Sequence, residues 1–264
     1  MTSDYTLAYG THATPEDGRC AMEWVSHLAG EPHGDEPLCV SPVLRAMCIA
    51  LNDGLDDVPR QRLRPFLART IGTADDGLDA ARAWMAMDWL IRTYTPVWLR
   101  AAGLQFAADD LSGRGEVVDQ ASLARALRAL QSARVVARTA RGEAFATARG
   151  GARASALAAG LAGREAAWTC AGAAAWAAAR LGVGDIAGDR ARAAARATAG
   201  DAAAIAARRA RSAAGHAGAR AAARAAIDPA LEALTDSALA LLDRMLPTEL
   251  LELPELAQRA PALI

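Results

Sequence analysis

The stretch Asp228-Pro-Ala-Leu-Glu-Ala-Leu-Thr-Asp-Ser-Ala-Leu-Ala-Leu-Leu-Asp-Arg-Met245 decides the fold class of this chain. Its apolar residues recur at the spacing of one helix face, namely Leu231, Leu234, Ala238, Leu241, Leu242 and Met245. An Asp-Pro pair is typical of a helix start, so we expect the last helix to begin at 228–229 and to end at Pro247. So sustained a stripe must be buried against other helices.

The segment before this helix is dominated by alanine, with 37 Ala among residues 151–227. Ala and Arg favour helix, and no alternating strand pattern appears. Glycines at 160–163, 182–184, 188, 200 and 215–218 are expected to divide the segment into roughly three helices. An alanine face buries little area, so this half should be the less stable one. Low-complexity disorder is the alternative, against which Trp168 and Trp176 argue as anchors.

The first 130 residues also follow helical spacing. Thr14-Pro15 and Ser41-Pro42 are cap-plus-proline signals, which predict helices at about 15–29 and 43–52. Further helices are expected at about 59–70, 75–94 (broken by Pro96), 104–111 and from Leu123 onward. The sequence therefore predicts an all-α, multi-helix globular bundle with an Ala/Arg-rich helical C-terminal half.

Charge is spread unevenly along the chain, whose 29 basic residues are all Arg. Residues 1–120 carry 10 Arg against 18 acids, residues 121–227 carry 17 against 5, and residues 228–264 carry 2 against 7. We expect an acidic helical domain with a polar pocket at 1–111, a linker at 112–119 and an Ala/Arg-rich bundle at 120–264, unless all pack as one fold. The charges either neutralise each other internally or leave a basic middle for an anionic partner.

Several classes of protein are not expected. No signal peptide is visible, and the longest uncharged run, 166–179, is shorter than the ~20 residues that span a bilayer. Irregularly spaced cysteines without a secretion signal indicate reduced thiols, so we expect a cytoplasmic protein without membrane contact. The basic cluster at 208–211 lacks aromatic neighbours for base stacking, so nucleic-acid binding is not expected.

Residues 12–53 hold most of the groups that carry chemistry, including three of the four His and three of the four Cys. On the helix expected at 15–29, Cys20, Glu23 and His27 share one edge. A thiolate, a carboxylate and an imidazole could hold zinc together with His33 or Cys39. The spacing matches no zinc signature, so a solvated helix edge is the preferred interpretation and no metal is expected.

The loop Glu31-Pro-His33-Gly-Asp35-Glu36-Pro-Leu-Cys39 is the strongest candidate for a functional element. Its prolines stiffen both ends, and stiff loops carrying His and carboxylates can pre-organise a site. His33 beside Asp35 could act as an oriented general base or acid near neutral pH. The alternative is a plain surface turn.

Two further carboxylates lie where local stability does not favour them. Asp53 follows a helix C-terminus, where acids oppose the helix dipole, so it could hold a cation or a substrate ammonium. Asp88 lies in the middle of an apolar helix with Arg92 four residues later. Trp84 and Trp89 beside it could form an apolar or cation–π wall. The alternatives are a solvated turn at Asp53 and a structural ion pair at Asp88.

Several runs within about residues 18–104 resemble a group of actinobacterial proteins without an assigned activity. They are Cys20-Ala-Met-Glu23, Leu28-Ala-Gly-Glu31-Pro-His33, Cys39-Val-Ser-Pro42-Val, Asn52-Asp-Gly-Leu55, Asp88-Trp89-Leu-Ile-Arg92 and Pro96-Val-Trp98-Leu99. The Ala/Arg-rich segment carries no comparable motif. The resemblance implies a compact N-terminal part and adds nothing about a reaction.

The leading hypothesis is a polar pocket between the loops 31–40 and 52–58 and the helix at 84–92. It would bind a small cationic or amine-bearing molecule, with acid–base catalysis in actinobacterial secondary metabolism as the enzymatic version. The proposed catalytic residues are His33, Asp35 and Asp88, and the proposed ligand-binding residues are Glu23, His27, Glu31, Glu36, Asp53, Trp84, Trp89 and Arg92. No cofactor motif is present. The alternative is a non-catalytic interaction protein whose basic helices bind an anionic partner or another subunit in a homo- or hetero-oligomer.

Overall fold

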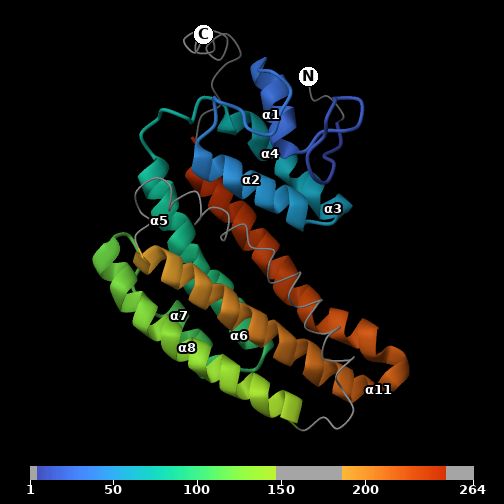
Figure 1. The fold of residues 1–264 in the computed structure, drawn as a ribbon, viewed down its shortest axis with the longest axis vertical. Coiled ribbons are helices and arrows are strands. Elements are labelled where there is room, and N and C mark those ends of the chain that lie inside the picture. The colour runs from blue at the N-terminus through green and yellow to red at the C-terminus, as the bar shows by residue number, and fades with distance from the viewer. Residues whose placement is uncertain (1–4, 147–185, 248–264) are drawn as a thin grey trace.

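The computed structural model describes residues 5–146 and 186–247 (Figure 1). Every regular element in these two ranges is helical, so the all-α prediction is confirmed. The α-helices are α1 (Ala21–Ala29), α2 (Pro42–Gly54), α3 (Asp57–Arg60), α4 (Arg64–Leu67), α5 (Asp79–Trp89), α6 (Thr95–Ala101), α7 (Gln105–Ser112), α8 (Gln120–Ala146) and α11 (Ile186–Met245). Short 3-10 helices η1 (Gln61–Leu63) and η2 (Ala68–Thr70) flank α4, and a π-helix, η3 (Leu90–Tyr94), joins α5 to α6.

Helix α1 begins later than its cap-plus-proline signal predicts. Thr14 and Asp17 form a turn, closed by a 3.2 Å bond from the Asp17 amide to the Thr14 carbonyl. The N-cap is Cys20, whose sulfur accepts from the Glu23 amide while the Glu23 side chain accepts from the Cys20 amide. This capping box fixes the start at Ala21, so the prediction of a helix from Pro15 is wrong.

Pro96 was expected to break the helix, but the helical path continues through it. It occupies the first turn of α6, directly after the wider turn of η3. Proline has no N–H to donate, and a π-helical turn accommodates such a defect locally. The Thr95 hydroxyl donates a 2.9 Å bond to the Leu90 carbonyl, which satisfies an acceptor of this turn. As a result α5, η3 and α6 run as one continuous element.

Helix α11 contradicts two predicted boundaries. Its helical hydrogen-bonding continues through Gly188, Gly200, the glycines at 215 and 218 and Pro229, so the predicted divisions at 188 and 200 and the helix start at 228–229 are wrong. Figure 1 shows that its ribbon is not straight: one arm lies beside α8, and a second arm, in red, returns towards α2. A glycine in a helix costs only about 1 kcal/mol, which burial of residues such as Ala199 and Ile227 offsets. The positions 160–163, 182–184, Trp168 and Trp176 lie outside the described residues.

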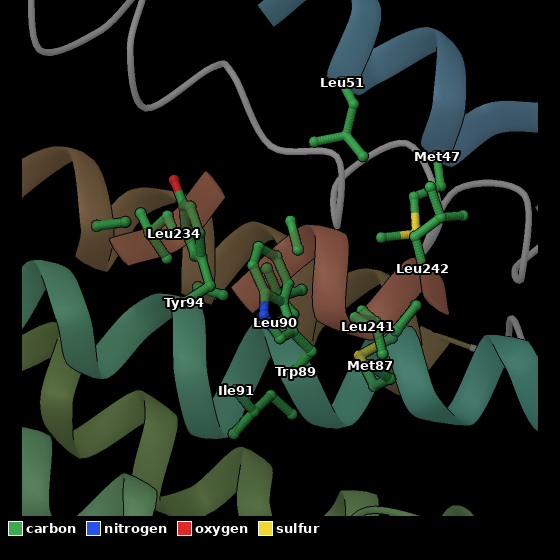
Figure 2. Packing of buried hydrophobic residues seen from close by; sticks show 14 of the residues in the cluster. Met47, Leu51, Met87, Trp89, Leu90, Ile91, Tyr94, Leu234, Leu241 and Leu242 are labelled. Atoms are coloured by element: carbon green, nitrogen blue, oxygen red, sulfur yellow. The ribbon is translucent and has the colours of Figure 1, made fainter. Parts of the chain in front are cut away.

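The buried residues form one continuous cluster that extends from Leu7 to Leu246. Figure 2 shows Leu241 and Leu242 of α11 packed between Met47 of α2 and the α5–η3 segment, which contributes Trp89 and Leu90. The stripe that decides the fold class is buried as predicted, with exposed fractions of 2% for Leu234 and 0% for Leu242. Both sides of the expected linker at 112–119 contribute to this core, and Val117 within it is itself buried. Within the described ranges, no helix is both long enough and apolar enough to cross a bilayer.

Two arginines of the N-terminal part hold the end of α11. Arg82 is 1% exposed and donates a 3.0 Å hydrogen bond from Nε to the Met245 carbonyl. Its two terminal nitrogens donate to both carboxylate oxygens of Asp76. Arg69 donates to the Asp243 carboxylate and to the Pro247 carbonyl. The orphan carbonyls of a helix C-terminus are thereby paired with cations, the charge that the helix dipole favours there.

Candidate functional site

Glu23, His33, Asn52 and Asp53 all contact the segment 5–20, an irregular stretch beside α1 and α2 that is called the N-terminal strap from here on. The centre of this cluster is Glu23, which is 1% exposed. Its carboxylate accepts from the His12 amide at 2.6 Å, from His12 Nδ1 at 2.8 Å and from the Cys20 amide at 2.7 Å. A buried carboxylate that accepts three hydrogen bonds is well satisfied and fixes the position of the backbone around it.

A second imidazole faces the same carboxylate. His33 donates from Nε2 to the His12 carbonyl at 2.9 Å, and the same Nε2 lies 3.9 Å from Glu23 Oε1. The side chains of His12 and His33 remain 12% and 20% exposed. Sequence reasoning assigned no role to His12, because it precedes Glu23 on an irregular segment where no periodic spacing relates the two.

The environment of Glu23 keeps it ionised. Burial alone would raise the pKa of Glu23, but hydrogen bonds from the His12 and Cys20 amides and from the His12 imidazole outweigh it and lower that pKa below its ordinary value. The negative charge is therefore present in the interior at neutral pH. Its donors all come from the protein itself, so the carboxylate is saturated rather than open to a ligand.

Asn52 and Asp53 also fasten the strap. Asn52 is fully buried, accepts from the Ala21 amide at 3.1 Å and donates to the Ala8 carbonyl at 2.9 Å. Asp53 is exposed and accepts from the Gly10 amide at 3.1 Å. The unfavourable position of Asp53 at a helix C-terminus thus has a structural explanation, since its carboxylate binds backbone rather than a free ammonium.

The loop 31–40 is closed by its own residues. Glu31 accepts from the Leu38 and Cys39 amides at 2.7 and 2.9 Å, so its carboxylate is used as an internal cap. Asp35 is half-buried and Glu36 is exposed, and the structure pairs His33 with His12 and Glu23 rather than with Asp35. On α1, His27 is exposed and packs its ring edge against Trp24, 5.4 Å between centroids.

The thiols of this region are poor nucleophiles and poor metal ligands. Burial raises the pKa of Cys20 to about 12 and that of Cys39 to about 12, with the neighbouring Glu31 adding to the shift at Cys39. Both therefore stay protonated near neutral pH, whereas metal binding and nucleophilic attack need the thiolate. In residues 5–146 and 186–247, no three His, Cys, Asp or Glu side chains are arranged to hold a metal ion.

Asp88 and the two tryptophans of α5 form a separate cluster. Asp88 is half-buried, pairs with Arg92 at 3.1 Å as the spacing predicts, and accepts from the Val117 amide at 2.9 Å. Trp89 is buried and donates from Nε1 to the Ser237 hydroxyl at 3.1 Å, while Trp84 is half-buried against the core. The partners of Asp88 lie on its own helical path and just before α8, whereas those of His33 lie on the strap and on α1. His33 and Asp88, which were expected to share one pocket, thus belong to two separate hydrogen-bonded clusters.

The clearest open surface lies on α8 instead. Its solvent side carries Arg128, Arg134 and Arg138, all exposed, together with Val135 and Val136, which are 66% and 45% exposed. These five residues are called the α8 face from here on. No acidic residue occurs between positions 120 and 142, and within the described part of the chain none of the three arginines has an ion-pair partner. The opposite side of the helix, including Leu123 and Leu130, is fully buried. Sequence reasoning predicted this amphipathic helix from its leucines but did not consider its outer side.

Comparison of the chain with protein-family models, with curated proteins and with solved structures finds no match. The function is therefore inferred from the chemistry of the three features above: the saturated cluster at Glu23, the ion pair at Asp88 and the α8 face.

Proposed function

We propose that this chain is a non-catalytic interaction protein that binds an anionic macromolecular partner through the α8 face. The observation that carries the proposal is a row of three exposed arginines, without ion-pair partners among residues 5–146 and 186–247, on a helix that lacks acids over positions 120–142. Uncompensated charges of one sign create a local potential that attracts an oppositely charged surface.

The distribution of ion pairs supports the same proposal. If the acidic residues of 1–120 neutralised the arginines of 121–227, many ion pairs would join these two ranges. Within the described part of the chain, Arg224–Asp56 is the only such pair, at 3.3 Å, with both side chains largely exposed. Arg141 pairs within the middle, with Asp201 at 2.9 Å. Most of the positive charge of α8 is thus left facing solvent.

The hydrogen bonds of the candidate carboxylates argue against a small-molecule site and so also favour the α8 face. The carboxylates of Glu23, Glu31 and Asp53 accept hydrogen bonds from backbone amides, and Asp88 accepts from the Val117 amide. Groups with these partners stabilise the fold and have little remaining capacity for a ligand. Four of the residues predicted to line a small-molecule pocket are thus engaged in hydrogen bonds within the fold.

A second proposal, binding of a small amine with acid–base chemistry, has one supporting observation. His12 and His33 flank the ionised Glu23, and their side chains remain 12% and 20% exposed, so both rings are accessible from solvent. Nuclear magnetic resonance titration of both imidazoles with a panel of small amines tests it. Shifts confined to these two rings would promote this proposal, and unchanged spectra would reject it.

The main proposal is tested with fluorescent poly-glutamate as the polyanion. The triple variant Arg128→Gln, Arg134→Gln, Arg138→Gln should bind at least tenfold more weakly than wild type, and the wild-type affinity should fall as salt screens the charges. Arg244→Gln is the matched control, since Arg244 is exposed on α11, outside the α8 face. Equal binding by wild type and the triple variant would reject the α8 face as the binding surface.

A further inference from the structure

We infer that the partner bound by the α8 face is an acidic amphipathic helix of another protein. This inference rests on the proposed function and specifies the chemistry of its partner. It follows from the two valines of the face, because its arginines alone would suit any polyanion.

Val135 and Val136 are placed against local preference. Branched side chains lose rotamer freedom in a helix, and Ala is the better helix former at an exposed position. Ala is the commonest residue of the basic segment 121–227, with 47 of its 107 positions, yet the chain places two adjacent valines on the solvent side of α8, 66% and 45% exposed. Their contribution to stability there is limited, because 66% and 45% of their surface stays in contact with solvent. A contact outside the chain would bury that surface.

The α8 face combines apolar and charged side chains over neighbouring turns of one helix. At about 100° per residue, Val135 lies within about 20° of Arg128, two turns earlier, and within about 60° of Arg138, one turn later. Arg134 and Val136 extend the face to either side. Arg134 and Arg138 therefore lie along one side of Val135 and Val136 lies on the other, and apolar side chains beside arginines are common in protein–protein contacts. Phosphate groups of a nucleic acid would pair with the arginines but leave the valines in water.

The support beneath the face is rigid. Ala133, Ala137 and Leu130 are buried at 3%, 0% and 0% exposure, so α8 is held along its inner side. The helix contains 27 residues and no glycine before position 142. It therefore offers a continuous rod of about 40 Å, long enough for several turns of a partner helix to pack at the usual 8–10 Å spacing. Glutamates beside an apolar stripe on that helix would meet the arginines while leucines cover the valines.

The test uses a synthetic peptide of about 16 residues with leucines at helical spacing and glutamates beside them. A scrambled peptide of the same composition and a short duplex DNA are the comparison probes. Fluorescence anisotropy at physiological salt should show the patterned peptide binding at least tenfold more tightly than the scramble. Val135→Ser with Val136→Ser should abolish that difference, and Val118→Ser, which alters a valine 57% exposed just before α8, should leave it intact. Circular dichroism confirms that both variants are folded.

The outcomes separate this inference from the proposed function. If the two peptides bind equally, or if the valine variant behaves as wild type, recognition is by charge alone and the helix partner is rejected while the α8 face stands. Tighter binding to the duplex than to the peptide also rejects it. If neither peptide, duplex nor poly-glutamate binds, the proposed function fails as well.

Discussion

Arg82 Nε donates a 3.0 Å hydrogen bond to the backbone carbonyl of Met245, 163 residues further along the chain. The same guanidinium binds both carboxylate oxygens of Asp76 and is 1% exposed. One buried cation thus joins the start of α5 to the end of α11. The acidic N-terminal part and the C-terminal helix are held together by this contact as well as by their shared core.

Replacing Arg82 tests the strength of this junction. Arg82→Met removes the cation and leaves Asp76 and the Met245 carbonyl without their partner, which typically costs about 3–5 kcal/mol for a buried pair. Urea denaturation measures the free energy of unfolding. Arg62→Met is the control, because Arg62 pairs with Asp236 at 2.7 Å with side chains 46% and 60% exposed, where such pairs contribute about 0–1 kcal/mol. Similar losses in the two variants would show that burial of Arg82 does not strengthen the junction.

Glu23→Gln should destabilise the protein in a pH-dependent manner. The pKa of Glu23 is lowered in the folded state from an ordinary value of 4.5, so its ionised form stabilises the fold above that value. The contribution is lost as pH falls through the lower, folded pKa. The difference in unfolding free energy between wild type and Glu23→Gln should therefore be largest near neutral pH and shrink below about pH 4.5. A difference that stays constant from pH 7 to pH 3 would contradict the role given to the charge.

The thiols should be unreactive in the folded protein. Because the pKa values of Cys20 and Cys39 are raised to about 12, their thiolate fraction near pH 8 is far below that of an ordinary cysteine. Alkylation by iodoacetamide, followed by peptide mass spectrometry, should be at least about 100-fold slower than in urea-unfolded protein. Rapid labelling of Cys39 in the native state would show that its environment raises the reactivity of the thiol, which would contradict this prediction.

Asp88→Ala should affect stability and leave binding by the α8 face unchanged. The variant removes the partner of Arg92 and the acceptor of the Val117 amide. Since both charged side chains are 24% exposed, a loss of about 1–3 kcal/mol is expected. Thermal melts measure the loss, and poly-glutamate titration checks the binding. A fully stable variant with weakened binding would instead place Asp88 in a binding site.

Helix content was predictable because burial imposes a period on the sequence. Leu123 and Leu130, and the stripe from Leu231 to Met245, have the spacing of a single buried face, and the structure buries all of them except Leu231, which is half-buried. The start of α1 was not predictable, because it depends on hydrogen bonds between Glu23 and residues of the strap. Glycine and proline signals failed in α11, because they report local preference and the burial of neighbouring residues outweighs it.

The contacts of the candidate site residues were also predictable only in part. The pair of Asp88 and Arg92 follows from i, i+4 spacing and is present in the structure. The partnership of His33 with His12 joins residues 21 positions apart on irregular segments, where sequence carries no geometric rule. The α8 face followed in principle from its amphipathic pattern, since a helix with one buried side must expose the other.

The central claim is that the α8 face binds an acidic helix, and a charge-exchange measurement tests it most directly. Arg138→Glu should weaken binding of the leucine-patterned glutamate peptide at least tenfold in fluorescence anisotropy. A peptide in which one glutamate is replaced by lysine should recover affinity for Arg138→Glu at one position along its charged side, and should lose affinity for wild type there. Equal binding by wild type and Arg138→Glu, or no recovery at any peptide position, would contradict the account.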